Sequence, residues 1–180
     1  MNDFNEKLGA MFLLLIKGKV VHRYSINRLL FFTDIANLLN TGRTISNEPY
    51  SKLPFGPVPK EMAYVRESLI LSEYLIEHCT EIACNKTFTY TVSDIVDFDK
   101  ITALFSPDEL NTINAVKEAL VDQSATFLAE QSHKFEPWKG GVIDGKLVLD
   151  RVFKDQDLIR WMQLNKMAGE NIHVPEAQAA

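Results

Sequence analysis

The chain of 180 residues is 46% hydrophobic, which is enough for one domain with a buried core. Its formal net charge is −5, with 24 acidic residues against 19 Lys and Arg. Because clustered cations bind phosphate groups, this balance argues against a nucleic-acid or anionic-membrane surface. The two cysteines, Cys79 and Cys84, form no CxxC pattern and no zinc-ligand spacing. We therefore expect no disulfide and no metal site, and a reducing cytoplasm fits best.

The N-terminal apolar segment is expected to form a core helix. Its apolar residues recur at helical spacing: Phe4, Leu8, Met11, Phe12 and Leu15. The run from Ala10 to Ile16 is too short to span a bilayer, and acidic residues precede it where a signal peptide would carry positive charge. We therefore predict no membrane segment, and a helix that ends near Gly18.

Residues 26–39 predict a helix at the centre of the fold, because they are apolar nearly all round. Asp34 is the exception, and a buried carboxylate is costly unless it is paired. His133 raises the same question on a later apolar helix. One interpretation makes Asp34 and His133 an acid–base or recognition pair. The favoured interpretation is a structural network in which they satisfy each other, or Tyr50, and hold the segment after the helix on the core.

Residues 48–62 contain four prolines, one glycine and two aromatic residues in the order EPYSKLPFGPVPKEM. Each proline fixes its own φ and favours extended geometry in the residue before it, so this segment is predicted to be a stiff, turning arm. Gly56 is the residue expected to take a positive φ, and Pro59 is expected to begin the next helix. The arm would carry Tyr50 and Phe55 across the protein's face.

The middle of the chain predicts one β-hairpin and then two helices. Residues 82–84 and 87–92 flank a turn at Asn85-Lys86, and the second run alternates apolar residues with threonine. Residues 106–109, Ser-Pro-Asp-Glu, supply an N-cap serine, a proline at the first helical position and the glutamate of a capping box. Ser124 can cap a second helix that runs to His133, and two short helices or one kinked helix would fit this region.

The last part of the chain completes a fold that we predict to be mainly α, a compact helical domain with one or two small β-hairpins. Trp138 is placed in a loop, 142–147 form a second hairpin around an Asp-Gly turn, and Asp155 caps a final helix. We expect a single domain over 1–168 and a flexible tail over 169–180, because the tail is small and polar.

No catalytic motif stands out in the sequence. There is no GxSxG, P-loop, HExxH or dinucleotide-binding glycine pattern, and the four histidines are scattered at positions 22, 78, 133 and 173. We therefore predict a protein that is not an enzyme and uses no cofactor. A small hydrolase that uses Asp34 and His133 is the competing hypothesis, and it predicts that alanine at either position keeps the fold but abolishes turnover.

Four groups of residues together resemble the SocA-like, or Panacea, antitoxin domain family, over roughly residues 25–160. They are LLFFTD at 29–34, GRTI at 42–45, Tyr50 with LPFGPVP at 53–59, and Ser132-His133 with Pro137-Trp138. The sequence Phe-Gly-Pro-Val-Pro after an apolar helix ending in Asp is the specific part. The chain departs at Thr33, where a small apolar residue is usual, and the hairpin between residues 74 and 92 is variable in the family.

The resemblance implies a non-enzymatic antitoxin, of a kind often encoded by phages or prophages beside an unrelated toxin gene. Such proteins neutralise a cognate protein toxin by direct contact, and members act on different toxins, including toxic small alarmone synthetases. The SocA relative is an adaptor that delivers its toxin to the ClpXP protease, which gives a second mechanism. We predict toxin contact through the arm and its neighbours, and a structural or recognition network behind it. The contact residues are Tyr50, Phe55, Gly56, Pro57 and Trp138, and the network residues are Asp34, Ser132 and His133.

The main alternative is a winged-helix-like DNA-binding regulator of its own operon, built from the helices over 25–71 and the hairpin around Asn85-Lys86. Against it, the helix after the arm offers only Lys60 and Arg66 as cations, so a nucleic-acid partner is not expected. A separate observation concerns Gln178-Ala179-Ala180, since a small apolar terminus on an unfolded segment is what bacterial unfoldases grip. An inert tail is the favoured interpretation.

Overall fold

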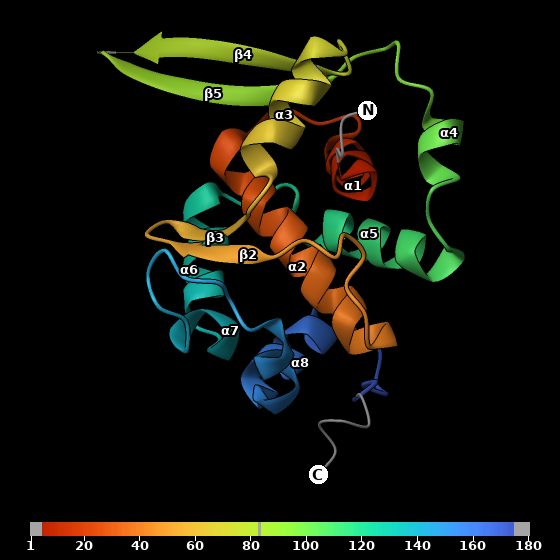
Figure 1. Ribbon diagram of the computed structural model, residues 1–180, viewed down its shortest axis with the longest axis vertical. Coiled ribbons are helices and arrows are strands. Elements are labelled where there is room, and N and C mark those ends of the chain that lie inside the picture. Colours follow the sequence, from red (N-terminus) through yellow and green to blue (C-terminus); the bar gives the residue numbers. More distant parts are fainter. Residues whose placement is uncertain (1–4, 83, 175–180) are drawn as a thin grey trace.

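The computed structural model describes residues 5–82 and 84–174, and shows helices packed around one long central helix, with two small antiparallel sheets (Figure 1). The helices are α1 (Glu6–Ile16), α2 (Arg23–Thr41), α3 (Met62–Leu71), α4 (Phe98–Thr102), α5 (Pro107–Leu120), α6 (Ala125–His133), α7 (Glu136–Lys139), the 3-10 helix η1 (Leu149–Lys154) and α8 (Gln156–Leu164). The strands are β1 (Val21–His22), β2 (Tyr50–Leu53), β3 (Gly56–Pro59), β4 (Leu75–Ile82) and β5 (Asn85–Val92).

The expectation of a mainly α fold is wrong, because the protein is mixed α/β. One sheet has three strands in the order β1-β5-β4, and the other pairs β2 with β3. Strand β1 was not foreseen because its two residues are too few to show a period, and it forms only by pairing Val21 with Tyr90 and His22 with Thr89. The hairpin β4–β5 was foreseen, but β4 starts at Leu75 and Asn85 lies within β5.

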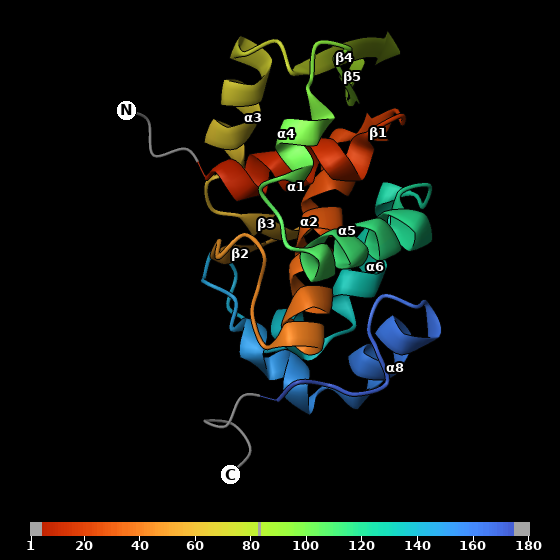
Figure 2. The same ribbon diagram turned by 90° about the vertical axis from the view of Figure 1, so that its right-hand side faces the viewer.

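Helix α2 occupies the centre of the molecule, and α1 and α5 lie across it (Figure 2). Side chains on all of its faces are buried, which confirms the expectation drawn from its apolar sequence. The side chain of His22 caps its start by accepting a hydrogen bond from the Tyr24 amide at 3.2 Å. Its end is at Gly42, whose φ of 76° is the left-handed conformation that favours glycine.

The three helix starts that local capping residues predicted are confirmed. Ser106 and Glu109 form a reciprocal capping box at α5, with Pro107 in the first turn. Ser124 accepts from the Phe127 amide at the start of α6. The carboxylate of Asp155 caps α8 through Leu158 N at 2.9 Å and also accepts from Glu136 N at 2.6 Å, so one side chain fixes the starts of α7 and α8.

The proline arm is a two-stranded β-hairpin, which makes the prediction for Pro59 wrong. Pro59 is the last residue of β3, paired with Tyr50, and α3 begins only at Met62. The two prolines of the ribbon are both in β3, which is an edge strand, so their missing N–H groups leave no ladder partner unpaired. The tips of both hairpins, β2–β3 and β4–β5, are on the same side of the molecule, at the left in Figure 1.

The second predicted hairpin, over 142–147, is also wrong. This segment makes a tight turn, and its two ends do not pair with each other as strands; it lies along β2 instead. Lys52 exchanges backbone hydrogen bonds with Asp144 at 2.8 Å and with Gly145 at 2.9 Å, and Leu147 N donates to Tyr50 O at 2.8 Å. The Asp-Gly turn thus supports the arm from outside.

Residues 169–174 contact the C-terminal end of α2. The amide of His173 donates to the Leu39 carbonyl at 2.8 Å, and the amide of Gly169 donates to Asn40 Oδ1 at 2.9 Å. Residues 175–180, including the two terminal alanines that were considered as a grip for an unfoldase, lie outside the described residues. Within residues 5–82 and 84–174, no helix is both long and apolar enough to cross a membrane.

Candidate functional site

Phe55 stands at the tip of the β2–β3 hairpin and is 73% exposed. Tyr24, 53% exposed on the first turn of α2, lies beside it, with the two ring centroids 6.4 Å apart. Gly56, next to Phe55, has a φ of 131°, and the sequence predicted a positive φ at this residue. Two large aromatic side chains from separate elements therefore form an exposed apolar edge.

A pocket of about 220 Å³ opens behind this edge, between α2, the hairpin, α3 and β5. We call it the arginine pocket, because Arg23, Arg28 and Arg66 line it and none of its lining residues is Asp or Glu. The other lining residues are mostly apolar or aromatic: Tyr24, Ile26, Asn27, Leu53, Phe55, Gly56, Val58, Met62, Ala63 and Tyr90. It combines an apolar wall with concentrated positive charge.

Arg28 is the unusual member of the arginine pocket. It is only 2% exposed, its Nη1 donates to the Tyr24 carbonyl, and its Nε is buried without a hydrogen-bond partner. No Asp or Glu of the described residues forms a salt bridge with it. Burial lowers its pKa to about 10, so the guanidinium still carries its charge at neutral pH. A buried cation without a counter-ion is costly, and an incoming anion would relieve that cost.

Asp34 is fully buried and accepts four hydrogen bonds from the segment that leads into the arm. Its donors are the amides of Ile45 at 2.7 Å and Ser46 at 2.9 Å, the Ser46 hydroxyl, and the Tyr50 hydroxyl at 2.8 Å. Burial raises the pKa of Asp34, and these hydrogen bonds oppose that rise. Burial, together with Asp34, also raises the pKa of Tyr50 well above its usual value. Asp34 thus ties the start of β2 to α2.

His133 does not share this network. Its ring stacks on Trp138, with centroids 4.3 Å apart and planes 19° apart, and Lys52 Nζ lies 4.8 Å from a Trp138 ring centroid. Burial, then the charges of Arg28 and Lys52, lower the pKa of His133. Its Nε2 is buried without a partner in the described structure, and no hydrogen bond joins it to Asp34. The two residues therefore form no acid–base pair.

The predicted contact residues divide into one exposed side chain and four buried residues. Phe55 is exposed, whereas Tyr50, Gly56, Pro57 and Trp138 are buried. The predicted network also divides, because Ser132 donates within its own helix to the Ala129 carbonyl at 2.8 Å. The buried residues have positions that support the arm, and only Phe55 is directly available to a partner.

Sequence reasoning missed Arg28, Arg23 and Tyr24. The argument that singled out Asp34, a charge on an apolar helix, applies equally to Arg28, so the signal was present. Arg23 and Tyr24 gave no signal, because only the fold brings the start of α2 beside the hairpin tip.

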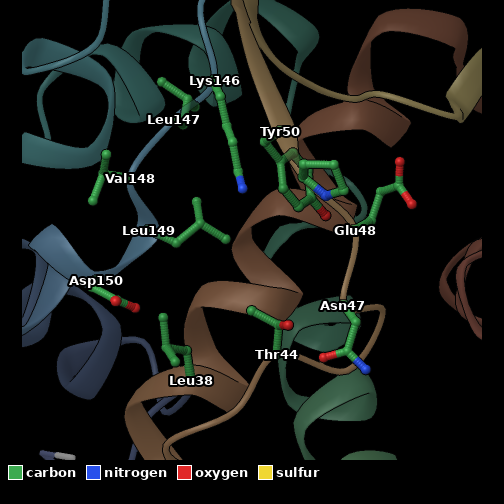
Figure 3. A pocket seen from close by; sticks show the side chains of 11 residues that line it. Leu38, Thr44, Asn47, Glu48, Tyr50, Lys146, Leu147, Val148, Leu149 and Asp150 are labelled. Atoms are coloured by element: carbon green, nitrogen blue, oxygen red, sulfur yellow. The ribbon is translucent and has the colours of Figure 1, made fainter. Parts of the chain in front are cut away.

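A second pocket, of about 510 Å³, lies between the C-terminal half of α2, the segment 44–50 and the segment 146–150 (Figure 3). Lys146 extends into it, while Asp150, from the same segment, lies at the left in Figure 3. The carboxylate of Glu48 is already engaged by Asn5 Nδ2 at 3.0 Å and Glu61 N at 2.8 Å. The described residues that line it include no Ser, Cys or His, so it offers no histidine base and no serine or cysteine nucleophile.

The family model for the SocA-like antitoxin, Panacea domain, matches residues 26–139, more than half of the chain, and the protein therefore belongs to this family. The match begins in α2 and ends at α7, so it includes the Asp34 network, the hairpin and the His133–Trp138 stack. Arg23 and Tyr24 precede it. No curated protein and no solved structure matches the chain.

Proposed function

We propose that this protein is an antitoxin that neutralises a cognate protein toxin by direct binding, through the surface formed by Phe55, Tyr24 and the arginine pocket. Membership of the antitoxin family supports a toxin as the partner. The observation that carries the choice of surface is the exposed Phe55–Tyr24 edge beside the pocket. Aromatic and arginine side chains are the residue types most enriched at the energetic centres of protein interfaces.

The support behind the hairpin favours a preformed binding surface. Tyr50 is held by Asp34, and β2 is held by its backbone hydrogen bonds to the 142–147 turn. An element that is already ordered loses little conformational freedom on binding, so more of the contact energy appears as affinity. A rigid tip that carries Phe55 is consistent with neutralisation by occlusion.

Delivery of the toxin to ClpXP remains a second proposed mechanism, supported by the family resemblance alone. The resemblance also leads us to propose a gene beside its toxin gene in a phage or prophage. We propose action in the cytoplasm, because Cys79 and Cys84 are exposed and unpaired, as thiols in a reducing compartment are.

The competing functions have less support. For DNA binding, α3 carries Arg66 beside Glu67, and β4 adds Glu77 and Glu81, so the helix and hairpin of a winged-helix reader would be poor in cations. For hydrolysis, the Asp34 carboxylate is fully buried and hydrogen-bonded. We therefore propose a non-enzymatic role.

Co-expression tests this function. The product of the neighbouring gene is expressed alone, with the wild-type protein, with Phe55→Asp, and with Leu164→Asp as a control. Leu164 on α8 is 73% exposed, the same fraction as Phe55, but lies outside the proposed surface. We expect the neighbouring gene product to be toxic when it is expressed alone. The wild type and Leu164→Asp should rescue growth and co-purify with it, and Phe55→Asp should do neither. If the neighbouring gene product is harmless alone and does not co-purify with the protein, the proposed antitoxin function is wrong. If Phe55→Asp still neutralises the toxin, the proposed binding surface is wrong.

A further inference from the structure

The arginine pocket has three features that define its occupant. First, its ionisable lining is cationic, with Arg23, Arg28 and Arg66 from two helices. The carboxylate of Glu77, on the neighbouring strand β4, accepts the Tyr90 hydroxyl at 2.8 Å and so places one negative charge beside the pocket, against the three arginines. The pocket therefore has an excess of positive charge, and an occupant with a negative group is complementary to it.

Second, two lining residues have buried polar atoms without partners, and the two atoms need opposite kinds of group. Arg28 Nε is a donor and Asn27 Oδ1 is an acceptor. Both atoms are buried, and Arg28 Nε lies against Gly56, so an occupant reaches them only when their side chains turn toward it. A peptide segment then meets both needs, because an Asp or Glu side chain accepts from a guanidinium while a backbone N–H donates to an amide oxygen. Inorganic phosphate carries a P–OH donor as well as acceptors at neutral pH, so the two unpartnered atoms alone do not separate it from a peptide. The apolar lining of the pocket does, because phosphate has no apolar part to bury against it.

Third, the size and the apolar walls restrict the occupant further. At about 220 Å³, the pocket is smaller than the roughly 300–1,000 Å³ typical of sites for small molecules and cofactors. It is therefore suited to one or two inserted side chains. Ile26, Val58 and Met62 form apolar wall next to the arginines, and the exposed ring of Phe55 stands at the rim. An acidic residue beside an apolar residue fits this combination.

We propose that the arginine pocket binds an acidic residue of the partner protein together with an adjacent apolar residue, the carboxylate pairing with the Arg28 guanidinium. This inference rests on the proposed function for the identity of the partner as the toxin. Arg23 and Arg66 contribute positive charge around the same carboxylate, and Phe55 covers the apolar residue. A planar guanidinium suits a carboxylate better than an ammonium group would, because it offers parallel donors.

The first experiment needs no toxin. Random peptides displayed on phage are selected on the immobilised full-length protein, and enriched peptides are synthesised with each Asp or Glu in turn replaced by Asn or Gln. We expect enriched peptides in which an acidic residue adjoins an aromatic or aliphatic one. Removal of that carboxylate should weaken binding by about tenfold or more, as for other buried, hydrogen-bonded charge pairs.

Protein variants then locate the binding. Arg66→Glu reverses a half-buried charge of the pocket, and Arg28→Met removes the buried charge while keeping an unbranched side chain. Arg160→Glu, an exposed reversal on α8, is the matched control. We expect both pocket variants to lose binding to the acidic peptides and Arg160→Glu to keep it. If Arg28→Met does not fold, as judged by its thermal unfolding, Arg66→Glu alone decides.

Several results would overturn the inference. The selection could enrich no peptides, or only peptides without acidic residues. The enriched peptides could bind the Arg66→Glu variant as tightly as they bind the wild type. Inorganic phosphate could displace the peptides, which would indicate a small-anion site. The toxin assay separates this failure from that of the proposed function. If Arg66→Glu and Arg28→Met still neutralise the toxin, the pocket is not the toxin-binding site, but the antitoxin function stands. If acidic peptides bind in a way that depends on Arg66 while the product of the neighbouring gene is harmless, the antitoxin function is refuted, but the pocket stands.

Discussion

Gly56 lies directly against Arg28, so that a Cβ atom on the glycine would come within 2.6 Å of the arginine Nε. The same glycine has a φ of 131°, which residues with a side chain rarely adopt. Space and backbone conformation therefore both require glycine here. This contact sets how closely β3 approaches α2, and with it the position of Phe55.

Replacing Gly56 with alanine should destabilise the protein by about 2–4 kcal/mol, from backbone strain together with the displacement of a buried arginine. Gly18→Ala is the control, because Gly18 has a φ of 75° but a Cβ there would meet no atom within 4 Å. It should cost about 1 kcal/mol, from strain alone. Urea unfolding measures both. Equal losses would mean that the contact with Arg28 contributes nothing.

Removing the Asp34 carboxylate should separate the start of the arm from α2. Asp34→Ala leaves two buried amides and two hydroxyls without their acceptor, and we expect a loss of about 3–5 kcal/mol. Tyr50→Phe removes only one of the four donors and should cost about 1–2 kcal/mol. Chemical denaturation compares the two variants. If Tyr50→Phe lowers the free energy of unfolding as much as Asp34→Ala does, the four hydrogen bonds do not each contribute to stability, and the network is contradicted.

His133 should make stability depend on pH. Its pKa is lowered from 6.5 in the folded protein, so as the pH falls below 6.5 the unfolded chain takes up a proton that the folded chain does not. Wild-type stability should therefore decrease between about pH 7 and pH 5, and His133→Phe should flatten this decrease while keeping an aromatic ring against Trp138. Thermal unfolding across this range gives the measurement, and parallel curves for the two proteins would refute the prediction. His22, whose pKa is also lowered, is present in both.

The capping box of α5 gives a local prediction. Ser106→Ala removes the acceptor for the Glu109 amide, 3.2 Å away, and should cost about 1 kcal/mol. Ser106→Asp, which restores a side-chain acceptor at the same place, should recover most of the loss. Urea unfolding of the two variants provides the test. If aspartate is as destabilising as alanine, the capping bond is not the source of the effect.

The sequence predicted those parts of the fold that neighbouring residues determine. Ser106, Ser124 and Asp155 each cap a helix through a residue three positions on, so the signal and the structure lie in the same short segment. Strand β1 and the path of 142–147 depend on partners far along the chain, Tyr90 for one and Tyr50 for the other. No local pattern contains that information.

The candidate site divides in the same way. The need of Asp34 for a partner was evident from its apolar helix, and Tyr50 was one of the partners proposed, but the choice between Tyr50 and His133 needed the fold. The exposure of Phe55, at the tip of a ribbon stiffened by prolines, agrees with the predicted arm. The burial of Trp138 could not be foreseen, because an aromatic residue serves a core and an interface equally well.

His22 is both the last residue of β1 and the cap of α2. The chain passes from sheet to helix there without an intervening loop, so no hinge separates the three-stranded sheet from the helix turn that carries Arg23 and Tyr24. A partner that touches β5 together with Arg23 and Tyr24 therefore meets one rigid surface, and it needs to match a fixed shape.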